Sequence, residues 1–188
     1  MKYDFYFVHG WCFSKSFWSP VKKQIEKEKF SGYIGNVDLN FFSKCKKSIN
    51  EKKFNNNEIF IVHSYGLNWF LKKNLKCKVL INFFGLPDFI GFQKKPNFIR
   101  SGLDKMLSEF SINPEKVIEK FYDKCEVRCS YMKNFNRKNL VHALINLKSN
   151  NQTLKLINAK YNIFSIYSND DKVVNIDTEK IKKIEKEN

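Results

Sequence analysis

Apolar residues gather in five short runs that alternate with longer stretches of mixed character. The runs have the length and the β-branched and aromatic content of strands, and they cover residues 3–8, 33–39, 59–62, 79–84 and 162–167. The first four begin about 20 to 30 residues apart, the size of a strand with its crossover helix. Because this alternation is typical of a parallel sheet with helices on both faces, the pattern predicts an α/β fold.

A long insert without strand pattern separates the fourth run from the fifth, over about residues 86–155. Helices are expected within it over 98–110, 114–125 and 139–147, and Asn113-Pro114 is a start signal of cap followed by proline. An insert at this place predicts a helical lid. A chain of 188 residues has room for one core and little room for a second, so we expect a single domain over residues 1–188.

The third apolar run ends abruptly in Val62-His63-Ser64-Tyr65-Gly66. A strand that turns sharply into a helix strains the backbone of the turn residue and exposes its side chain at the carboxyl end of the sheet. Ser64 is therefore the candidate nucleophile. Gly66 fits the pattern G-x-S-x-G of such an elbow, whereas Val62 does not. The alternative is a buried strand that ends in an ordinary turn.

The first apolar run leads into His9-Gly10-Trp11. Hydrolases with an elbow serine hold the developing oxyanion with the N–H of the residue after the nucleophile and an N–H from a loop after an earlier strand. Here these donors would be the backbone amides of Tyr65 and Trp11. Gly10 suits such a loop because a residue without Cβ lets the backbone approach closely. A plain turn after a strand is the alternative.

Together, segments 7–11, 36–39 and 62–66 resemble the α/β-hydrolase superfamily and, within it, the pimeloyl-acyl-carrier-protein methyl ester esterases of biotin synthesis. Residues 103–110 and 119–122 look like the helical lid of those esterases. The resemblance implies an α/β-hydrolase sheet with helices on both faces, shortened at both ends. It also implies a serine carboxylesterase without cofactor or metal that acts on the pimeloyl ester of an acyl carrier protein.

The fifth run is followed by Asp170-Asp171-Lys172-Val173-Val174. In the resembled fold the acid of the catalytic triad sits just after such a strand, in the pattern Asp-x-apolar-apolar. Asp171 matches that register and is the candidate acid, with Asp170 one residue off. An acidic turn, common after any strand, is the alternative.

The base of the triad has no clear place in the sequence. The order serine, acid, histidine requires a histidine after Asp171, and residues 172–188 contain none. Of the three histidines, His9 belongs to the oxyanion loop and His63 is expected to point away from the nucleophile. His142 is the only substitute base, although it lies in a helical stretch where a histidine packed in the core is the better interpretation.

Three explanations of the missing base stay open. The sequence is truncated, a partner supplies the residue, or the protein no longer hydrolyses anything, since a serine without its base is a poor nucleophile. The last explanation gives an alternative function: a catalytically silent relative that binds an acyl carrier or another acidic partner.

The net charge of +15 raises the question of nucleic acid. Three of the 34 basic residues are arginines, whereas basic grooves tend to use arginine where geometry matters, and no nucleic-acid-binding motif is present. We therefore expect no nucleic-acid partner. The three arginines, Arg100, Arg128 and Arg137, all fall in the lid insert beside several lysines. A basic rim there would suit an acidic acyl carrier protein.

The five cysteines are an odd number at irregular spacing, which predicts neither a disulfide framework nor a zinc site.

The first apolar run is interrupted by Asp4 and is too short for a signal peptide, and no stretch has transmembrane length. A reduced cytoplasm without membrane association is the simplest expectation. Acyl-chain length and oligomeric state stay open.

Overall fold

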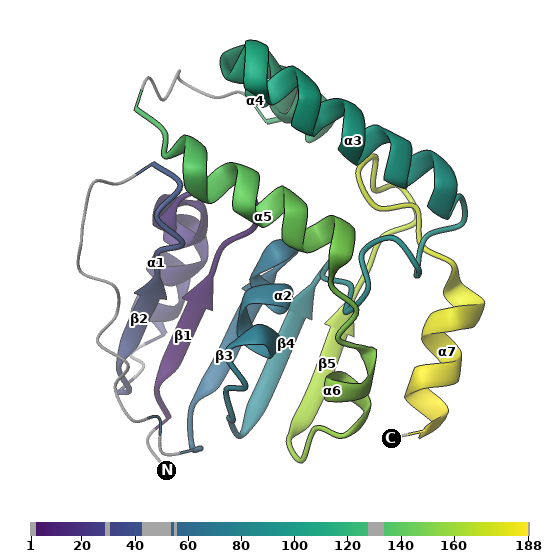
Figure 1. Cartoon of the computed structure of the whole chain (residues 1–188). Coiled ribbons are helices and arrows are strands. Elements are labelled where there is room, and N and C mark those ends of the chain that lie inside the picture. The colour runs from purple at the N-terminus through teal and green to yellow at the C-terminus, as the bar shows by residue number, and fades with distance from the viewer. Residues whose placement is uncertain (1–2, 29–30, 43–53, 55, 128–133, 188) are drawn as a thin grey trace.

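The computed structural model describes residues 3–28, 31–42, 54, 56–127 and 134–187 (Figure 1). Its strands form one parallel sheet in the order β2-β1-β3-β4-β5. They are β1 (Phe5–Val8), β2 (Ile34–Val37), β3 (Ile59–His63), β4 (Val79–Phe83) and β5 (Asn162–Ile166). The five expected strands and the α/β class are therefore confirmed; β3 is one residue longer than its apolar run, and the other four strands are one to three residues shorter than theirs.

Helices cover both faces of the sheet. On one face Phe7 and Ile61 pack against Trp18, which lies in the short helix η1 (Lys15–Trp18) just before α1 (Ser19–Lys27). On the other face Val8, Phe60 and other strand residues pack against α2 (Tyr65–Lys72). Because alternate residues of a strand point to opposite faces, these two clusters follow from the apolar runs of the sequence.

The insert between β4 and β5 holds α3 (Pro96–Ile112), α4 (Pro114–Lys124), α5 (Arg137–Ser149) and α6 (Thr153–Ile157). The first three are close to the expected helices, whereas α6, and α7 (Thr178–Glu187) after β5, were not expected from the sequence. Asn113 caps α4 by accepting a hydrogen bond from the backbone N–H of Lys116 at 3.0 Å, as the cap-proline signal indicated.

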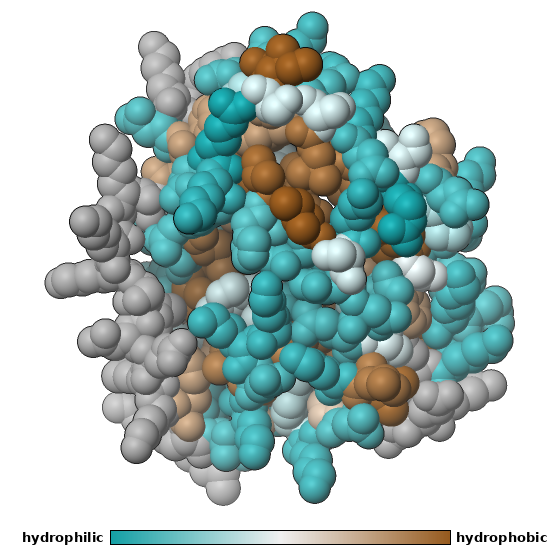
Figure 2. All heavy atoms as spheres, viewed as in Figure 1, coloured by the Kyte–Doolittle hydropathy of each residue, from teal (hydrophilic) through white to brown (hydrophobic). Residues whose placement is uncertain are grey.

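The strands point with their carboxyl ends toward the lid helices α3, α4 and α5 (Figure 1). The apolar faces of these helices share one core with the loops after β1 and β2, through residues such as Leu103, Tyr122 and Leu140. The surface in the same view is mostly hydrophilic, with apolar side chains gathered near the lid (Figure 2). Within the described ranges, no helix combines the length and apolar character needed to cross a bilayer.

Candidate active site

Ser64 stands at the turn from β3 into α2 with φ 52° and ψ −117°. This is the strained conformation expected of a nucleophile elbow. The turn is held by hydrogen bonds from Ser64 N to Phe83 O at 2.8 Å and from Leu67 N to Ser64 O at 3.0 Å. A Cβ at Gly66 would lie 3.0 Å from the carbonyl oxygen of Val8, so the close approach of α2 to β1 favours glycine there.

The loop after β1 runs directly beside the elbow. A Cβ at Gly10 would lie 3.1 Å from Ser64 Cβ and 2.6 Å from His63 Nδ1. Trp11 is the residue after Gly10 and therefore begins next to the nucleophile. Tyr65 is the first residue of α2, where backbone N–H groups have no acceptor within the helix. The loop that carries the Trp11 amide thus lies beside the elbow that carries the Tyr65 amide, and their role as the oxyanion hole stays a prediction.

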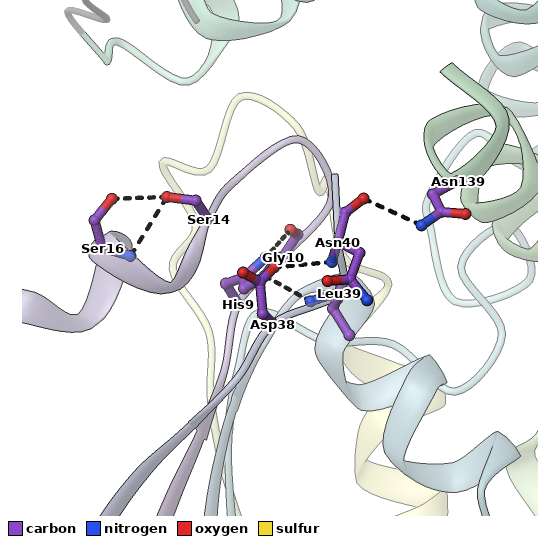
Figure 3. Close-up of polar contacts among 8 residues, drawn as sticks. All are labelled: His9, Gly10, Ser14, Ser16, Asp38, Leu39, Asn40 and Asn139. Atoms are coloured by element: carbon purple, nitrogen blue, oxygen red, sulfur yellow. Dashed lines mark hydrogen bonds and ion pairs between the residues drawn. The ribbon is translucent and has the colours of Figure 1, made fainter. Parts of the chain in front are cut away.

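His9 fixes this loop to the loop after β2 (Figure 3). Its ring is fully buried, and Nε2 accepts a hydrogen bond from Leu39 N at 3.0 Å, which leaves the proton on Nδ1 for the carbonyl of Gly10 at 3.0 Å. The carboxylate oxygen Oδ1 of Asp38 lies 3.6 Å from the same Nε2. His9 is a structural histidine.

Ser64 opens onto a cavity of about 280 Å³ that also contains Asp171. Asp171 Oδ1 accepts hydrogen bonds from Val173 N at 2.7 Å and Val174 N at 2.9 Å, so the carboxylate is fixed by its own loop. Asp170 lines the same cavity but is exposed. Aromatic rings form much of the remaining wall, and they come from four separate positions: Phe13, Phe17, Phe84 and Phe121.

The lid closes one side of this cavity through the end of α4 and the residues after it, including Cys125 and Glu126. Glu126 forms an ion pair with Lys172 from the loop after β5, and both line the cavity. Burial raises the pKa of the Cys125 thiol to about 12, with a further contribution from the Asp171 charge. The thiol therefore stays protonated at neutral pH and does not compete with Ser64 as a nucleophile.

His63 lines the cavity beside Ser64, which corrects the expectation that it points away. The positive φ of Ser64 breaks the alternation of the strand, so both side chains reach Gly10. The imidazole stacks on Phe17 at 4.6 Å between ring centroids, and within the described structure its buried Nδ1 has no hydrogen-bond partner. Burial and, to a smaller extent, the nearby His9 lower the pKa of His63 to about 4.

His142 does not line this cavity; it lies exposed on α5. Its Nδ1 is 3.4 Å from the Asn146 side-chain amide, which donates to the hydroxyl of Tyr65 at 3.0 Å. The expectation of a core position was wrong, because the neighbouring Ile145 is 46% exposed and the buried stripe of α5 runs through Ala143 and Leu144 instead. The structure thus places Ser64 and Asp171 together and leaves His142 outside.

The three arginines assigned to carrier binding differ in their surroundings. Arg137 donates through Nη2 to the carbonyls of Phe110, at 3.0 Å, and Ser111 at the end of α3. Arg100 is exposed on α3. Arg128 lies outside the described residues. Within the described part of the chain, no cluster of three or more His, Cys, Asp or Glu side chains could hold a metal ion.

Searches of protein-family models and of curated proteins find no match to this chain. Solved structures do match it over most of its length, and they are α/β-hydrolases, so the chain has the α/β-hydrolase fold.

It is similar to MenH from S. aureus, with a TM-score of 0.61 and 13% identity over 87% of this chain and 74% of that one. It is also similar to a putative aryl esterase from Burkholderia cenocepacia, with a TM-score of 0.63 and 14% identity over 100% of this chain and 78% of that one. A third similar structure is the N-formylmaleamic acid deformylase Nfo from Pseudomonas putida, with a TM-score of 0.62 and 11% identity over 100% of this chain and 81% of that one.

Proposed function

We propose that this protein is a serine hydrolase that cleaves carboxylic esters, with Ser64 as the nucleophile. The observation that carries the proposal is the strained conformation of Ser64 at the mouth of a cavity that also holds the fixed carboxylate of Asp171. Two of the similar structures are named as a putative aryl esterase and a deformylase, and these names agree with acyl-transfer chemistry at the elbow.

In the proposed reaction Ser64 Oγ attacks the ester carbonyl, and the backbone amides of Trp11 and Tyr65 hold the oxygen that becomes negative. The proton of Ser64 Oγ passes through a base to the alcohol oxygen as the C–O bond to the alcohol breaks, and water then cleaves the acyl-serine to give the acid and restore the Ser64 hydroxyl. Asp171, whose carboxylate accepts two backbone N–H groups, would orient the imidazole of the base and stabilise its protonated form, the identity of that histidine being open.

A serine-directed fluorophosphonate tests the nucleophile. We expect mass spectrometry to find the label on Ser64, and Ser64→Ala to abolish both labelling and ester turnover. Ser168 lines the same cavity, so Ser168→Ala is the matched control and should keep both. Labelling at Ser168 with Ser64 untouched, in a sample that hydrolyses esters, contradicts the proposal.

The finer proposal is that the ester is carried by an acyl carrier protein, in particular the pimeloyl methyl ester. Its support is the sequence resemblance, together with an aromatic-walled cavity of about 280 Å³, which suits a short acyl chain, and the lysines Lys124 and Lys172 on its lining. The lysine ammonium groups would attract the phosphate and acidic surface of a carrier.

A second candidate is a catalytically silent relative that binds the carrier without hydrolysis. It is favoured by the surroundings of Ser64, where His63 is the histidine that the described structure places on the cavity wall. A general base works best with a pKa near the working pH, and a pKa of about 4 makes His63 a weak acceptor for the serine proton. Turnover of a chromogenic ester no faster than that of Ser64→Ala, in a sample that binds the carrier, would favour this candidate.

A further inference from the structure

The loop that carries the Trp11 amide contains a second strained residue. Gly10 to Phe13 form a turn closed by a hydrogen bond from Phe13 N to Gly10 O at 3.3 Å, and Cys12 in its third position has φ 59°. Positive φ at that position normally calls for glycine or asparagine. Since a residue with a Cβ holds such a conformation only where its surroundings enforce it, the contacts of Cys12 decide how the turn is oriented.

These contacts come from the lid. Tyr122 on α4 is buried, and its hydroxyl donates a hydrogen bond of 2.5 Å to the backbone carbonyl of Cys12. The same hydroxyl is 3.7 Å from Cys12 Sγ, which can donate to it in return. A single phenol therefore holds both the backbone and the side chain of the strained residue, from a position 110 residues along the chain.

A second contact fixes the neighbouring residue. The indole Nε1–H of Trp11 donates to the carbonyl of Leu140 on α5 at 3.0 Å, and its ring meets Phe121 edge-on with 4.7 Å between ring centroids. The turn is thus held by both lid helices that border it. The Cys12 carbonyl belongs to the same peptide unit as Phe13 N, which closes the turn on Gly10 O, so the Tyr122 bond holds that unit from its other side.

We propose that Tyr122 is a positioning residue for the oxyanion hole: by bonding the carbonyl of strained Cys12, it keeps the Trp11 amide directed at the site where negative charge develops beside Ser64. The lid then has a role in the reaction beyond covering the cavity, because α4 sets the geometry of a loop that contacts the nucleophile. This inference rests on the proposed ester hydrolysis for its catalytic part, and on the described contacts alone for its structural part.

Tyr122→Phe removes the hydroxyl and keeps the ring. Tyr161→Phe is the matched control, because Tyr161 is a half-buried tyrosine that packs on Phe70 with 5.9 Å between ring centroids and is not part of the Ser64 cavity wall. Amide hydrogen exchange over residues 10–13 and steady-state hydrolysis of a p-nitrophenyl ester are measured for both variants and for the unchanged chain. Rates are normalised to the folded fraction from near-ultraviolet circular dichroism.

We expect exchange of the amides of residues 11–13 to be at least about tenfold faster in Tyr122→Phe than in Tyr161→Phe, since the turn loses its fixed carbonyl. We expect kcat to fall by about tenfold with KM within about twofold, because loss of one oxyanion donor costs about 10²–10³ in kcat and misalignment loses part of that. A change confined to packing would not separate kcat from KM in this way.

Unchanged exchange over residues 10–13 in Tyr122→Phe overturns the inference, and so does unchanged kcat in a chain that turns over esters. If the unchanged chain shows no turnover above the buffer rate, the proposed function fails. The exchange experiment then still decides whether Tyr122 holds the turn.

Discussion

Close contacts around Ser64 make Gly10 a position where any side chain is costly. An added Cβ would meet the ring of His63 at 2.6 Å and Ser64 Cβ at 3.1 Å. His63 has little freedom to withdraw, because its ring is stacked on Phe17 and edge-on to Phe13. The glycine of the His-Gly-Trp sequence therefore serves packing at the elbow as well as the approach of the backbone to a substrate.

Gly10→Ala is expected to destabilise the fold by about 1–3 kcal/mol, as for overpacking of a core, and to remove labelling of Ser64. Gly102→Ala is the matched control: an added Cβ there meets no atom within 4 Å, and the residue lies inside α3. In an exposed helix alanine is favoured over glycine by about 1 kcal/mol, so this variant should gain stability. Urea denaturation measures the free energy of unfolding of both variants. Equal changes of the same sign in the two variants would show that the elbow has more room than the contacts indicate.

At the scale of elements, several charges of the lid hold its helices together. Arg137 at the start of α5 bonds the last carbonyls of α3, which a helix leaves without partners. Glu109 on α3 pairs with Lys105 and with Lys120 on α4, and its pKa is lowered, first by the hydrogen bond from Lys120. The basic character read from the sequence is therefore partly internal.

Arg137→Ala is expected to lower the free energy of unfolding by about 1–2 kcal/mol, because it removes a charged donor from two carbonyls. Arg100→Ala changes an exposed side chain on α3 and should stay within about 0.5 kcal/mol. Chemical denaturation of the two variants compares them directly. A larger loss for Arg100→Ala than for Arg137→Ala contradicts the helix-end role.

For carrier binding, the same contacts favour Arg100 over Arg137 as a residue that meets a partner. Titration of an acyl carrier protein at low salt should give a Kd in the micromolar range that weakens steeply with salt, since exposed charges are screened beyond about 10 Å at 0.1 M. Arg100→Glu should weaken it further. Absence of carrier binding at low salt, with tight binding of duplex DNA, would move the nucleic-acid interpretation ahead.

At the scale of the whole molecule, burial of His63 couples stability to pH. Its folded-state pKa of about 4 lies below the ordinary value of 6.5. Between these two values the unfolded chain binds a proton that the folded protein does not, so the stabilising effect is complete above about pH 6.5 and is lost as pH falls toward 4. The loss is on the order of 3 kcal/mol from the size of the shift.

His63→Gln should therefore show a smaller loss of stability between pH 6.5 and pH 4 than the unchanged chain. His142→Gln is the control, because His142 is exposed on α5 and its removal should leave the pH profile as it was. Urea midpoints at a series of pH values give both profiles. Parallel profiles for the unchanged chain and His63→Gln would mean that the His63 ring is accessible to water.

Local chemistry explains what the sequence determined by itself. Apolar runs of strand length, a cap followed by proline at Asn113, and a serine followed by glycine after a buried strand each act within a few residues. They were enough for the parallel sheet, three of the lid helices and the position of Ser64 at the turn into α2. Asp171 was chosen over Asp170 because it matches the Asp-x-apolar-apolar pattern of the resembled fold; its carboxylate is bound by its own loop, and its role as the triad acid stays a prediction.

Only the tertiary structure decided the surroundings of these residues. Tyr122 and Cys12 are 110 residues apart, and Arg137 lies 27 residues from the carbonyl of Phe110, so no local pattern links them. The side of α5 that faces the core depends on where α2 and α3 lie, which is why His142 was misplaced. His63 reaches the cavity because the elbow breaks the strand's alternation, and its low pKa arises from the burial that the whole fold creates.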